Sequence, residues 1–227
     1  MSYNLDSLQL TSLFSDFDIL QSQHGASRYN AIYGAGEIQK PKICLVFMNP
    51  TARNVSASQD WDGIRAPWVG TKNIWKMFYQ LGIFTNYEIV QKIEKIKPDE
   101  WTPDFAYDLY SEVAKESIYI TNIAKCTQED ARHVKNDVYK DYRDLMLQEL
   151  DEIQPEATFA FGNQVSSVLL GRNISVSNYT GESDEILSTK QYSHKIYPTY
   201  YPVGQGRRNI SKSIERINAV LRIESVD

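Results

Sequence analysis

The 227-residue sequence contains only two cysteines and no long apolar run, and these absences exclude several protein classes. Cys44 and Cys126 are too few for a disulfide framework or a cysteine-based metal site. No apolar run approaches the roughly 18 residues that a membrane-spanning helix needs. The first residues also lack the basic and apolar segments of a secretory signal. We therefore expect a cytoplasmic protein without a membrane, metal or cofactor partner.

The chain also lacks an excess of positive charge, because its 24 Lys and Arg are outnumbered by 29 Asp and Glu and the net charge is −5. Proteins that bind nucleic acid contact phosphates through Lys and Arg, so this chain would need a local basic patch. Two groups of residues are candidates for such a patch. They are Arg207, Arg208, Lys212 and Arg216 near the end of the chain, and Lys125, Arg132, His133 and Lys135 in its middle.

Two motif classes are missing as well. The sequence has no G-x-x-x-x-G-K-[ST] and no G-x-G-x-x-G after a predicted strand, which disfavours a nucleotide-handling enzyme of another family. It has no H-x-E or C-x-x-C set, so a zinc deaminase is also disfavoured.

Strand and helix patterns alternate through most of the chain. Short apolar runs predict strands at Ile43–Phe47, 117–121, Ala157–Phe161 and 195–199. Apolar residues at helical spacing predict helices at 7–21, 73–81, 105–115, 138–153, 163–170 and 210–221. This order predicts one three-layer α/β domain with a mainly parallel central sheet. We expect residues 1–40 to form a helical segment packed on a domain of residues 41–227.

Two polar, proline-containing loops follow predicted strands. One is Phe47-Met48-Asn49-Pro50-Thr51 and the other is residues 198–202, with the sequence P-T-Y-Y-P. Ligands of open α/β sheets bind at the carboxyl ends of the strands, so the two loops could form one small site. Residues 51–71 form a long predicted loop with two tryptophans, and loops of that length are often functional.

These motifs resemble the uracil-DNA glycosylase superfamily over roughly residues 40–222. F-M-N-P at 47–50 is similar to the first motif, G-(I/M)-N-P-G, of the mismatch-specific and single-strand-selective branches, and residues 73–82 are similar to the following helix. P-W-V-G at 67–70 and I-T-N-I-A-K-C at 120–126 resemble P-F-V-G and I-T-N-V-V-K-C of the thermophilic iron–sulfur branch. F-A-F-G at 159–162 and P-T-Y-Y-P parallel its A-L-G and P-T-Y-H-P.

The sequence departs from this family pattern at several positions. Only Cys126 has a counterpart among the four cysteines of the iron–sulfur branch, so we predict no cluster. Tyr201 stands where the second motif normally has a histidine, and Phe47 and Thr51 replace the glycines of the first motif. Residues 60–62 add Asp-Trp-Asp to the long loop. These changes alter the pocket wall and the contact to the leaving group, so the substrate base stays open.

The resemblance implies a monofunctional, monomeric DNA glycosylase that flips a pyrimidine-type base and hydrolyses its N-glycosidic bond, leaving an abasic site. The base that the family implies is uracil. The replaced glycines, the missing histidine and the tryptophan-bearing loop would also suit a larger modified base, such as a hypermodified phage cytosine removed in antiphage defence. The alternative is a weakly active or inactive member that binds DNA or a modified base without excising it.

The resemblance also assigns roles to individual residues. Asn49 would orient the attacking water through its side-chain carbonyl, although Asn-Pro pairs also simply initiate turns. Asn122 would read the edge of the base, although it could equally cap a helix or turn. Trp68 would stack on the base or belong to the core. Tyr201 would donate a hydrogen bond to the departing base, although the neighbouring Tyr200 could equally be the one that faces the site. Phe47 and Met48 would line the pocket.

Residues 203–209 resemble the loop that inserts into the minor groove. Gly204 and Gly206 would allow close approach to DNA, and Gln205 or Arg207 would fill the space left by the flipped base. Arg208 would hold a phosphate, aided by the amino terminus of the following helix. The alternative is an arginine-rich turn in solvent.

Overall fold

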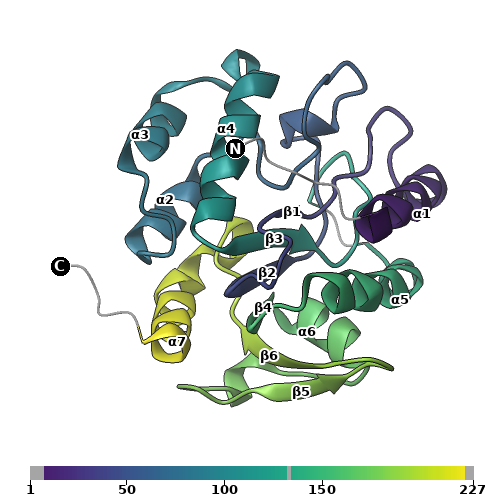
Figure 1. The fold of residues 1–227 in the computed structure, drawn as a ribbon, viewed down its shortest axis with the longest axis vertical. Helices are drawn as coiled ribbons and strands as arrows, with labels where there is room; N and C mark the ends of the chain where they lie inside the picture. Colours follow the sequence, from purple (N-terminus) through teal and green to yellow (C-terminus); the bar gives the residue numbers. More distant parts are fainter. Residues whose placement is uncertain (1–7, 132–133, 223–227) are drawn as a thin grey trace.

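A computed structural model describes residues 8–131 and 134–222 (Figure 1). Its sheet has the strand order β1-β3-β2-β4-β6-β5, and the four central strands are parallel to one another. The two edge strands, β1 and β5, are antiparallel to their neighbours. The predicted mainly parallel sheet is therefore confirmed. The strands are β1 (Ala35–Gly36), β2 (Ile43–Phe47), β3 (Ile118–Asn122), β4 (Ala157–Phe161), β5 (Glu185–Ser188) and β6 (Ser193–Thr199).

Helices cover both faces of the sheet, which gives three layers (Figure 1). One face carries α1 (Leu8–His24), α5 (Asn136–Ile153) and α6 (Asn163–Leu170). The other carries α2 (Asn73–Gln80), α3 (Tyr87–Lys95), α4 (Pro103–Lys115) and α7 (Ile210–Leu221). No helix among these described residues is long and apolar enough to cross a membrane.

Both faces of the central strands are buried, and this explains their continuous apolar sequences. In β2, Leu45 and Phe47 pack toward the α2, α4 and α7 layer, whereas Cys44 and Val46 pack toward α1 and α5. All five residues of β2 and all five of β4 are buried. A strand buried on both faces has no polar alternation, so its apolar run marks its limits well.

The strand register brings the two motif loops to one edge of the sheet. Phe47 pairs with Asn122 between β2 and β3, and Phe161 pairs with Thr199 between β4 and β6. The first motif begins at Phe47 and the second ends just beyond Thr199. The carboxyl ends of four parallel strands therefore present both loops together.

The backbone of residues 26–33 is hydrogen-bonded to two segments that follow strands at this edge of the sheet. These segments are the long loop that follows β2 and the turn that follows β3. The pairs are Asn30–Ala57 at 2.8 Å, Tyr33–Arg65 at 3.0 Å, Ala26–Thr127 at 2.9 Å and Ile32–Lys125 at 3.0 Å. The region before residue 41 therefore contains a helix and also holds, through these hydrogen bonds, the segments that follow β2 and β3.

Some elements differ from their sequence-based predictions. The region 1–40 includes β1, which pairs with β3, so the proposed boundary at residue 41 separates two paired strands. The helix α3 lies in a segment whose charges obscured its apolar spacing, and its Asn86 side chain caps it by accepting from Ile89 N. His194, expected just before the last strand, lies within β6 because β5 pairs with that strand's first half.

Candidate active site

Asn49 lies two residues beyond the end of β2, half-buried, with both ends of its carboxamide bonded. Its Oδ1 accepts a hydrogen bond of 3.0 Å from the hydroxyl of Tyr139 on α5. Its Nδ2 donates to the carbonyl oxygen of Pro50, also at 3.0 Å. The side chain is therefore held in one orientation, as a group that positions a water molecule requires.

Tyr139 was not anticipated from the sequence. It is completely buried, and its partner Asn49 is 90 residues away. Burial raises the pKa of the Tyr139 phenol well above its usual value, and the nearby Cys126 and Tyr201 raise it further. The group therefore stays a neutral hydrogen-bond donor. Only the contact to Asn49 distinguishes it from an ordinary core tyrosine, and that contact cannot be read from helical spacing.

An aromatic cluster formed by Phe47, Trp68, Phe161 and Tyr201 lies on the face opposite α5. The Phe47 ring stacks on Phe161 at 4.5 Å between centroids. Trp68 and Tyr201 meet the Phe47 ring edge-on, at 5.0 and 6.2 Å. Phe47 itself is 0 % exposed, so a base could touch its ring only after a neighbour moves. In this structure the cluster is closed around Phe47.

Asn122 belongs to the same side of the sheet edge as Phe47, its register partner. It is 3 % exposed, and its side-chain amide has no hydrogen-bond partner among the residues that the structure describes. Its side-chain oxygen and nitrogen are not among the fully buried polar atoms that lack a partner, so the amide still reaches solvent at the edge of the sheet. Asn122 is thus neither a helix cap nor a bonded turn residue, and its amide is available to a ligand.

Behind Asn122 lies a buried ion pair. The Lys125 ammonium donates to the Asn122 carbonyl oxygen at 2.6 Å and to Glu149 Oε2 at 2.5 Å. It also donates to Thr121 Oγ1 at 2.7 Å, and it lies 4.9 Å from the ring centroid of Phe17. Burial lowers the pKa of Lys125, while Glu149 opposes that shift. The prediction that Lys125 belongs to an exposed basic patch is wrong, because every donor direction is used inside the protein.

Trp68 lies in the long loop with a left-handed backbone conformation, φ 64°. This conformation costs a non-glycine residue on the order of 1 kcal/mol. The Trp68 carbonyl accepts from Trp75 Nε1 at 3.2 Å and from Thr71 Oγ1 at 2.7 Å, and these bonds hold the turn. The Trp68 indole N–H is buried without a partner among the described residues. The residue is both a loop residue and a neighbour of the core.

Tyr201 is partly buried beside Gly162 and Phe47. Burial raises the pKa of its phenol to about 12, and no charged neighbour contributes. The hydroxyl is therefore neutral, and able to donate a hydrogen bond, at neutral pH. Unlike the histidine that the family pattern has here, it cannot supply a positive charge.

Met48 is separated from the other predicted pocket residues. Strand alternation directs its side chain to the α1 and α5 face, where it packs against the buried residues between these helices and the sheet. Its backbone carbonyl accepts from Ala124 N at 3.1 Å, next to the bond of 2.7 Å from Ile123 N to the Phe47 carbonyl. These bonds extend the β2–β3 ladder past the last paired residues, so Met48 contributes to the site through its backbone.

Residues 204–209 form a short 3-10 helix that leads directly into α7. Gly206 is required by the loop itself, because a Cβ there would lie 2.0 Å from the Tyr201 carbonyl oxygen. Gly204 has φ 58° and open space around it. Arg208 is exposed. Gln205 and Arg207, the predicted wedge, belong to this short helix, and their side chains lie outside what the structure describes.

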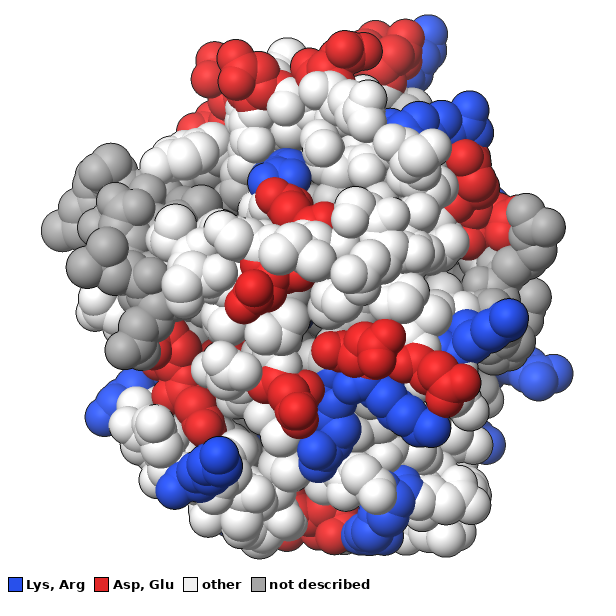
Figure 2. All heavy atoms as spheres, turned by 90° about the vertical axis from the view of Figure 1, so that its right-hand side faces the viewer, with Lys and Arg blue, Asp and Glu red and all other residues white. Residues whose placement is uncertain are grey.

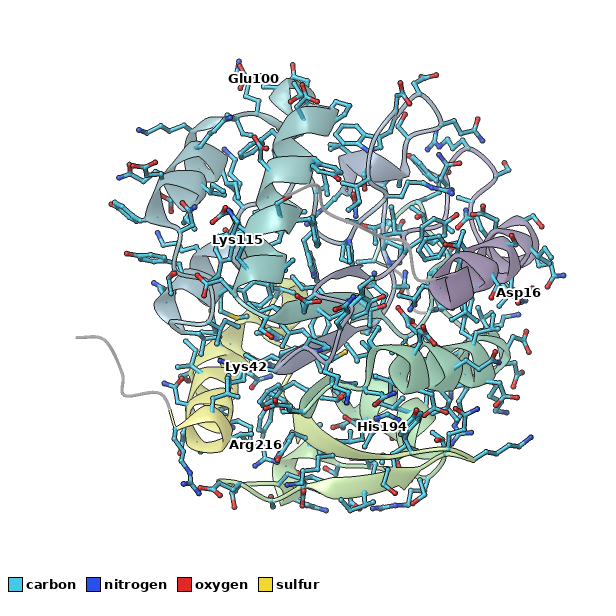
Figure 3. All side chains as sticks on the ribbon, viewed as in Figure 1. Asp16, Lys42, Glu100, Lys115, His194 and Arg216 are labelled. Carbon is cyan, nitrogen blue, oxygen red and sulfur yellow. The ribbon has the colours of Figure 1, made fainter. Side chains whose placement is uncertain are left out.

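The remaining basic residues divide into buried and exposed ones. Arg216 on α7 is 4 % exposed and donates to the carbonyl oxygens of Gly181, Ser183 and Pro198, so its predicted place in a surface patch is wrong (Figure 3). Lys135 and Lys212 are exposed. Arg132 and His133 lie outside the described residues.

Charge over the rest of the surface is mixed. On the face shown in Figure 2, acidic side chains are as prominent as basic ones, so that face is not a uniform phosphate track. A cavity of about 270 Å³ opens beside the turn after β3, lined by His24, Gln128, Glu129, Asp130, Val134, Lys135 and Val138. None of its lining residues belongs to the aromatic cluster. We therefore place the candidate site at the polar groups of the strand ends and not at this cavity. Among the described residues, no group of three or more His, Cys, Asp or Glu could hold a metal ion.

A family model described as the uracil DNA glycosylase superfamily matches residues 33–222, which is most of the chain. No curated protein matches the sequence. The matched range includes both motif loops, the aromatic cluster and Tyr139.

Proposed function

The chain belongs to the uracil-DNA glycosylase superfamily, and we propose that it is a monofunctional DNA glycosylase. Membership supports a glycosylase-like function on DNA in general. The further proposal is that the enzyme flips a pyrimidine-type base out of the strand and hydrolyses its N-glycosidic bond, leaving an abasic site. The observation that carries it is the Asn49 carboxamide, fixed at a strand end between Tyr139 and Pro50.

Hydrolysis of an N-glycosidic bond creates positive charge on the sugar and negative charge on the departing base. Asn49 would use the remaining lone pair of its carbonyl oxygen to hold a water molecule on the far face of the sugar. An amide is barely basic, so Asn49 positions the water rather than taking its proton. The enzyme should therefore be slow compared with one that uses a carboxylate.

The base would enter between Asn122 and the aromatic cluster. The unpartnered Asn122 amide can donate and accept one hydrogen bond each, which matches the edge of a pyrimidine. Trp68 would offer its face or its free N–H after moving away from Phe47. Tyr201 would donate to the developing base anion, which supplies weaker stabilisation than a positively charged group. Phe47 would support Trp68 and Tyr201 from below, and we assign Met48 no base contact.

The monofunctional assignment is supported by the state of Lys125. Lyase chemistry at an abasic site needs an amine nucleophile. The Lys125 amine next to Asn122 is fully buried and bonded to Glu149, Thr121 and the Asn122 carbonyl. Such an amine cannot reach a sugar, so Lys125 would not supply the nucleophile for cleavage beyond the abasic site.

Two substrate classes are proposed. The first is uracil in DNA. The second is a modified base, such as a hypermodified phage cytosine, whose removal would serve antiphage defence. The aromatic cluster supports the second, since its closed packing around Phe47 must rearrange to admit any base, and a rearranging pocket can favour a larger one.

A second candidate function is binding of DNA or a modified base without excision. The full enclosure of Phe47 and the tyrosine at position 201 favour it. Both features weaken the pocket and the leaving-group contact of a catalyst, while the fixed Asn49 favours turnover.

A panel of labelled DNAs tests the proposal. It contains uracil in single strands, in U·G and in U·A duplexes, and hydroxymethylated and glucosylated cytosine DNA, with alkali-labile breaks as the readout of base loss. We expect cleavage of at least one substrate and a loss of about 100-fold or more in Asn49→Ala. Asn178→Ala, at an exposed asparagine, is the matched control and should retain activity.

The other outcomes are equally informative. Binding without breaks on every substrate would replace the glycosylase with the binding function. Absence of both binding and cleavage would overturn the DNA-based proposal. Equal cleavage of uracil and modified-base substrates would remove support for the modified-base class.

A further inference from the structure

Tyr139 and Asn49 form a hydrogen bond between two layers of the domain. The hydroxyl of Tyr139, in the first turn of α5, donates to Asn49 Oδ1 at 3.0 Å. Tyr139 is 0 % exposed, whereas Asn49 is half-buried. The bond therefore reaches from the core to a side chain that solvent and ligands can approach.

The bond fixes the orientation of the Asn49 carboxamide, that is, the positions of its oxygen and its nitrogen. Tyr139 donates to Oδ1, and Nδ2 donates to the Pro50 carbonyl oxygen at 3.0 Å. Rotating the amide by half a turn would place Oδ1 against the Pro50 carbonyl oxygen, and two acceptors would then face each other. A carbonyl oxygen has two lone pairs, and Tyr139 uses one of them. The second lone pair is left in a fixed direction.

The donor itself is held rigidly. Tyr139 lies in the cluster that packs α5 on α1 and the sheet, where Tyr142 stacks on Phe17 at 6.3 Å. A buried phenol has few rotamers open to it, because interiors are packed at the density of organic crystals. Asn49 is thus aligned by an element that does not move with the loop.

We propose that Tyr139 is a positioning residue for the hydrolytic step, one that directs the free lone pair of Asn49 Oδ1 toward the attacking water. This inference rests on the proposed function of the site. The alternative is that Tyr139 only fills the core and that its bond to Asn49 satisfies a buried hydroxyl. The two differ in what they predict for rate and for binding.

Tyr142 provides a matched control on the same helix. It is also completely buried, and its hydroxyl lies beside the Cys126 thiol without any nitrogen or oxygen partner among the described residues. Tyr139→Phe and Tyr142→Phe each remove one buried hydroxyl from α5 and leave the ring in place. Only the first removes a bond to Asn49.

The experiment measures kcat and KM for excision by the wild type, Tyr139→Phe, Asn49→Ala, the double variant and Tyr142→Phe. A misplacement of about 1 Å costs up to about 100-fold in rate, so we expect a 10- to 100-fold lower kcat in Tyr139→Phe with KM unchanged. Tyr142→Phe should keep the wild-type rate. In the Asn49→Ala background, Tyr139→Phe should have no further effect, because the group that it positions is gone.

A nuclear magnetic resonance measurement separates this inference from the proposed function. The side-chain amide resonances of Asn49 should shift in Tyr139→Phe and stay in place in Tyr142→Phe. If the wild type excises no base but these resonances shift, the proposed function fails while the positioning contact stands. Unchanged resonances, an unchanged kcat in Tyr139→Phe, or equal losses with and without Asn49 would each overturn the inference.

Discussion

The ammonium nitrogen of Lys125 lies 2.5 Å from Glu149 Oε2 in the interior of the protein, and both side chains are only 1 % exposed. The pair links α5 to the turn after β3, because Lys125 also donates to the Asn122 carbonyl. Tyr119 and Thr121 donate to Glu149 Oε1, at 2.8 and 2.9 Å. Every charged atom of the pair therefore has a partner, which is the condition for burying an ion pair without large loss.

Removing one member of this pair should destabilise the fold. Lys125→Met leaves the Glu149 carboxylate buried without its cation, and we expect a loss of about 3–5 kcal/mol in the free energy of unfolding. Denaturant unfolding measures it. The control is Lys140→Met, which breaks an exposed ion pair with Asp137 on α5 and should leave the free energy of unfolding nearly unchanged. A double variant, Lys125→Met with Glu149→Leu, should recover part of the loss. If it is less stable than Lys125→Met alone, the ion pair is not the cause.

Tyr201 should give the protein a distinctive loss of stability at high pH. Its pKa is about 12 in the folded protein against an ordinary value of 10.0, so the folded state holds the proton more tightly. The stability from this group is complete below pH 10 and is lost as the pH rises through about 12. The maximum loss is about 2–3 kcal/mol at 1.36 kcal/mol for each unit.

Denaturant unfolding of wild type and Tyr201→Phe at pH 9 and pH 11.5 measures this effect. The difference between the two proteins should change by more than about 1 kcal/mol, with wild type losing more on going to the higher pH. Tyr139 and Tyr142 remain in both proteins, so their own titrations cancel. A difference that does not change with pH would contradict the burial of the Tyr201 phenol.

Phe47 should control which bases enter the site. Phe47→Ala removes the ring that Trp68, Phe161 and Tyr201 contact, and we expect a stability loss of about 3–5 kcal/mol from the cavity. The space should also raise excision of the larger modified bases relative to uracil. The control is Phe105→Ala, at a buried residue of α4 on the same face of the sheet as Phe47. It should destabilise the protein without changing the substrate ratio, and an equal change in both variants would contradict the role of Phe47.

Arg208 should contribute to DNA binding through a phosphate. Arg208→Ala should weaken binding to all sequences alike and lower the salt dependence, the slope of log K against log salt, by about 1. Fluorescence anisotropy at several salt concentrations measures it. Arg222→Ala provides the control, because Arg222 is exposed and pairs with Glu182 beyond the carboxyl end of α7. Equal slopes for wild type and Arg208→Ala would place the DNA elsewhere.

The parts of the fold that follow from local sequence were predictable. The strands Ile43–Phe47 and Ala157–Phe161 have the predicted bounds, because buried parallel strands are apolar throughout and their ends are sharp. The helix α6 ends before Gly171, whose φ of 68° is the left-handed conformation that stops a helix. The strand β1 could not be predicted in this way, because its two residues are too few to show an apolar run or an alternation.

The contacts that complete the site were not predictable in the same way. Lys125 looks like a surface residue by type, although its apolar neighbours Ile123, Ala124 and Cys126 are a signal of burial. Its partner Glu149 lies on the buried face of α5, where a carboxylate is unexpected. Tyr139 occupies a core-facing position at which a tyrosine is ordinary. Its role depends on its hydrogen bond to Asn49, and the spacing of residues within α5 does not show which residue of another segment Tyr139 will contact.

The bracing of the site edge by the amino-terminal region has a consequence for the order of folding. The amide of Thr127 donates to the Gln21 side chain at 2.7 Å across 106 residues, and α1 packs on α5, which comes later still. During synthesis at about 5–20 residues each second, α1 would wait many seconds for its partner. We expect α1 to dock after β2 has paired with β3, a strand that precedes α5 in the chain. Pulse-labelled hydrogen exchange should therefore show the amides of α1 protected after those of β2 and β3, whereas earlier protection would contradict this order. The loops at the strand ends would then acquire their final conformation only when α1 packs on α5.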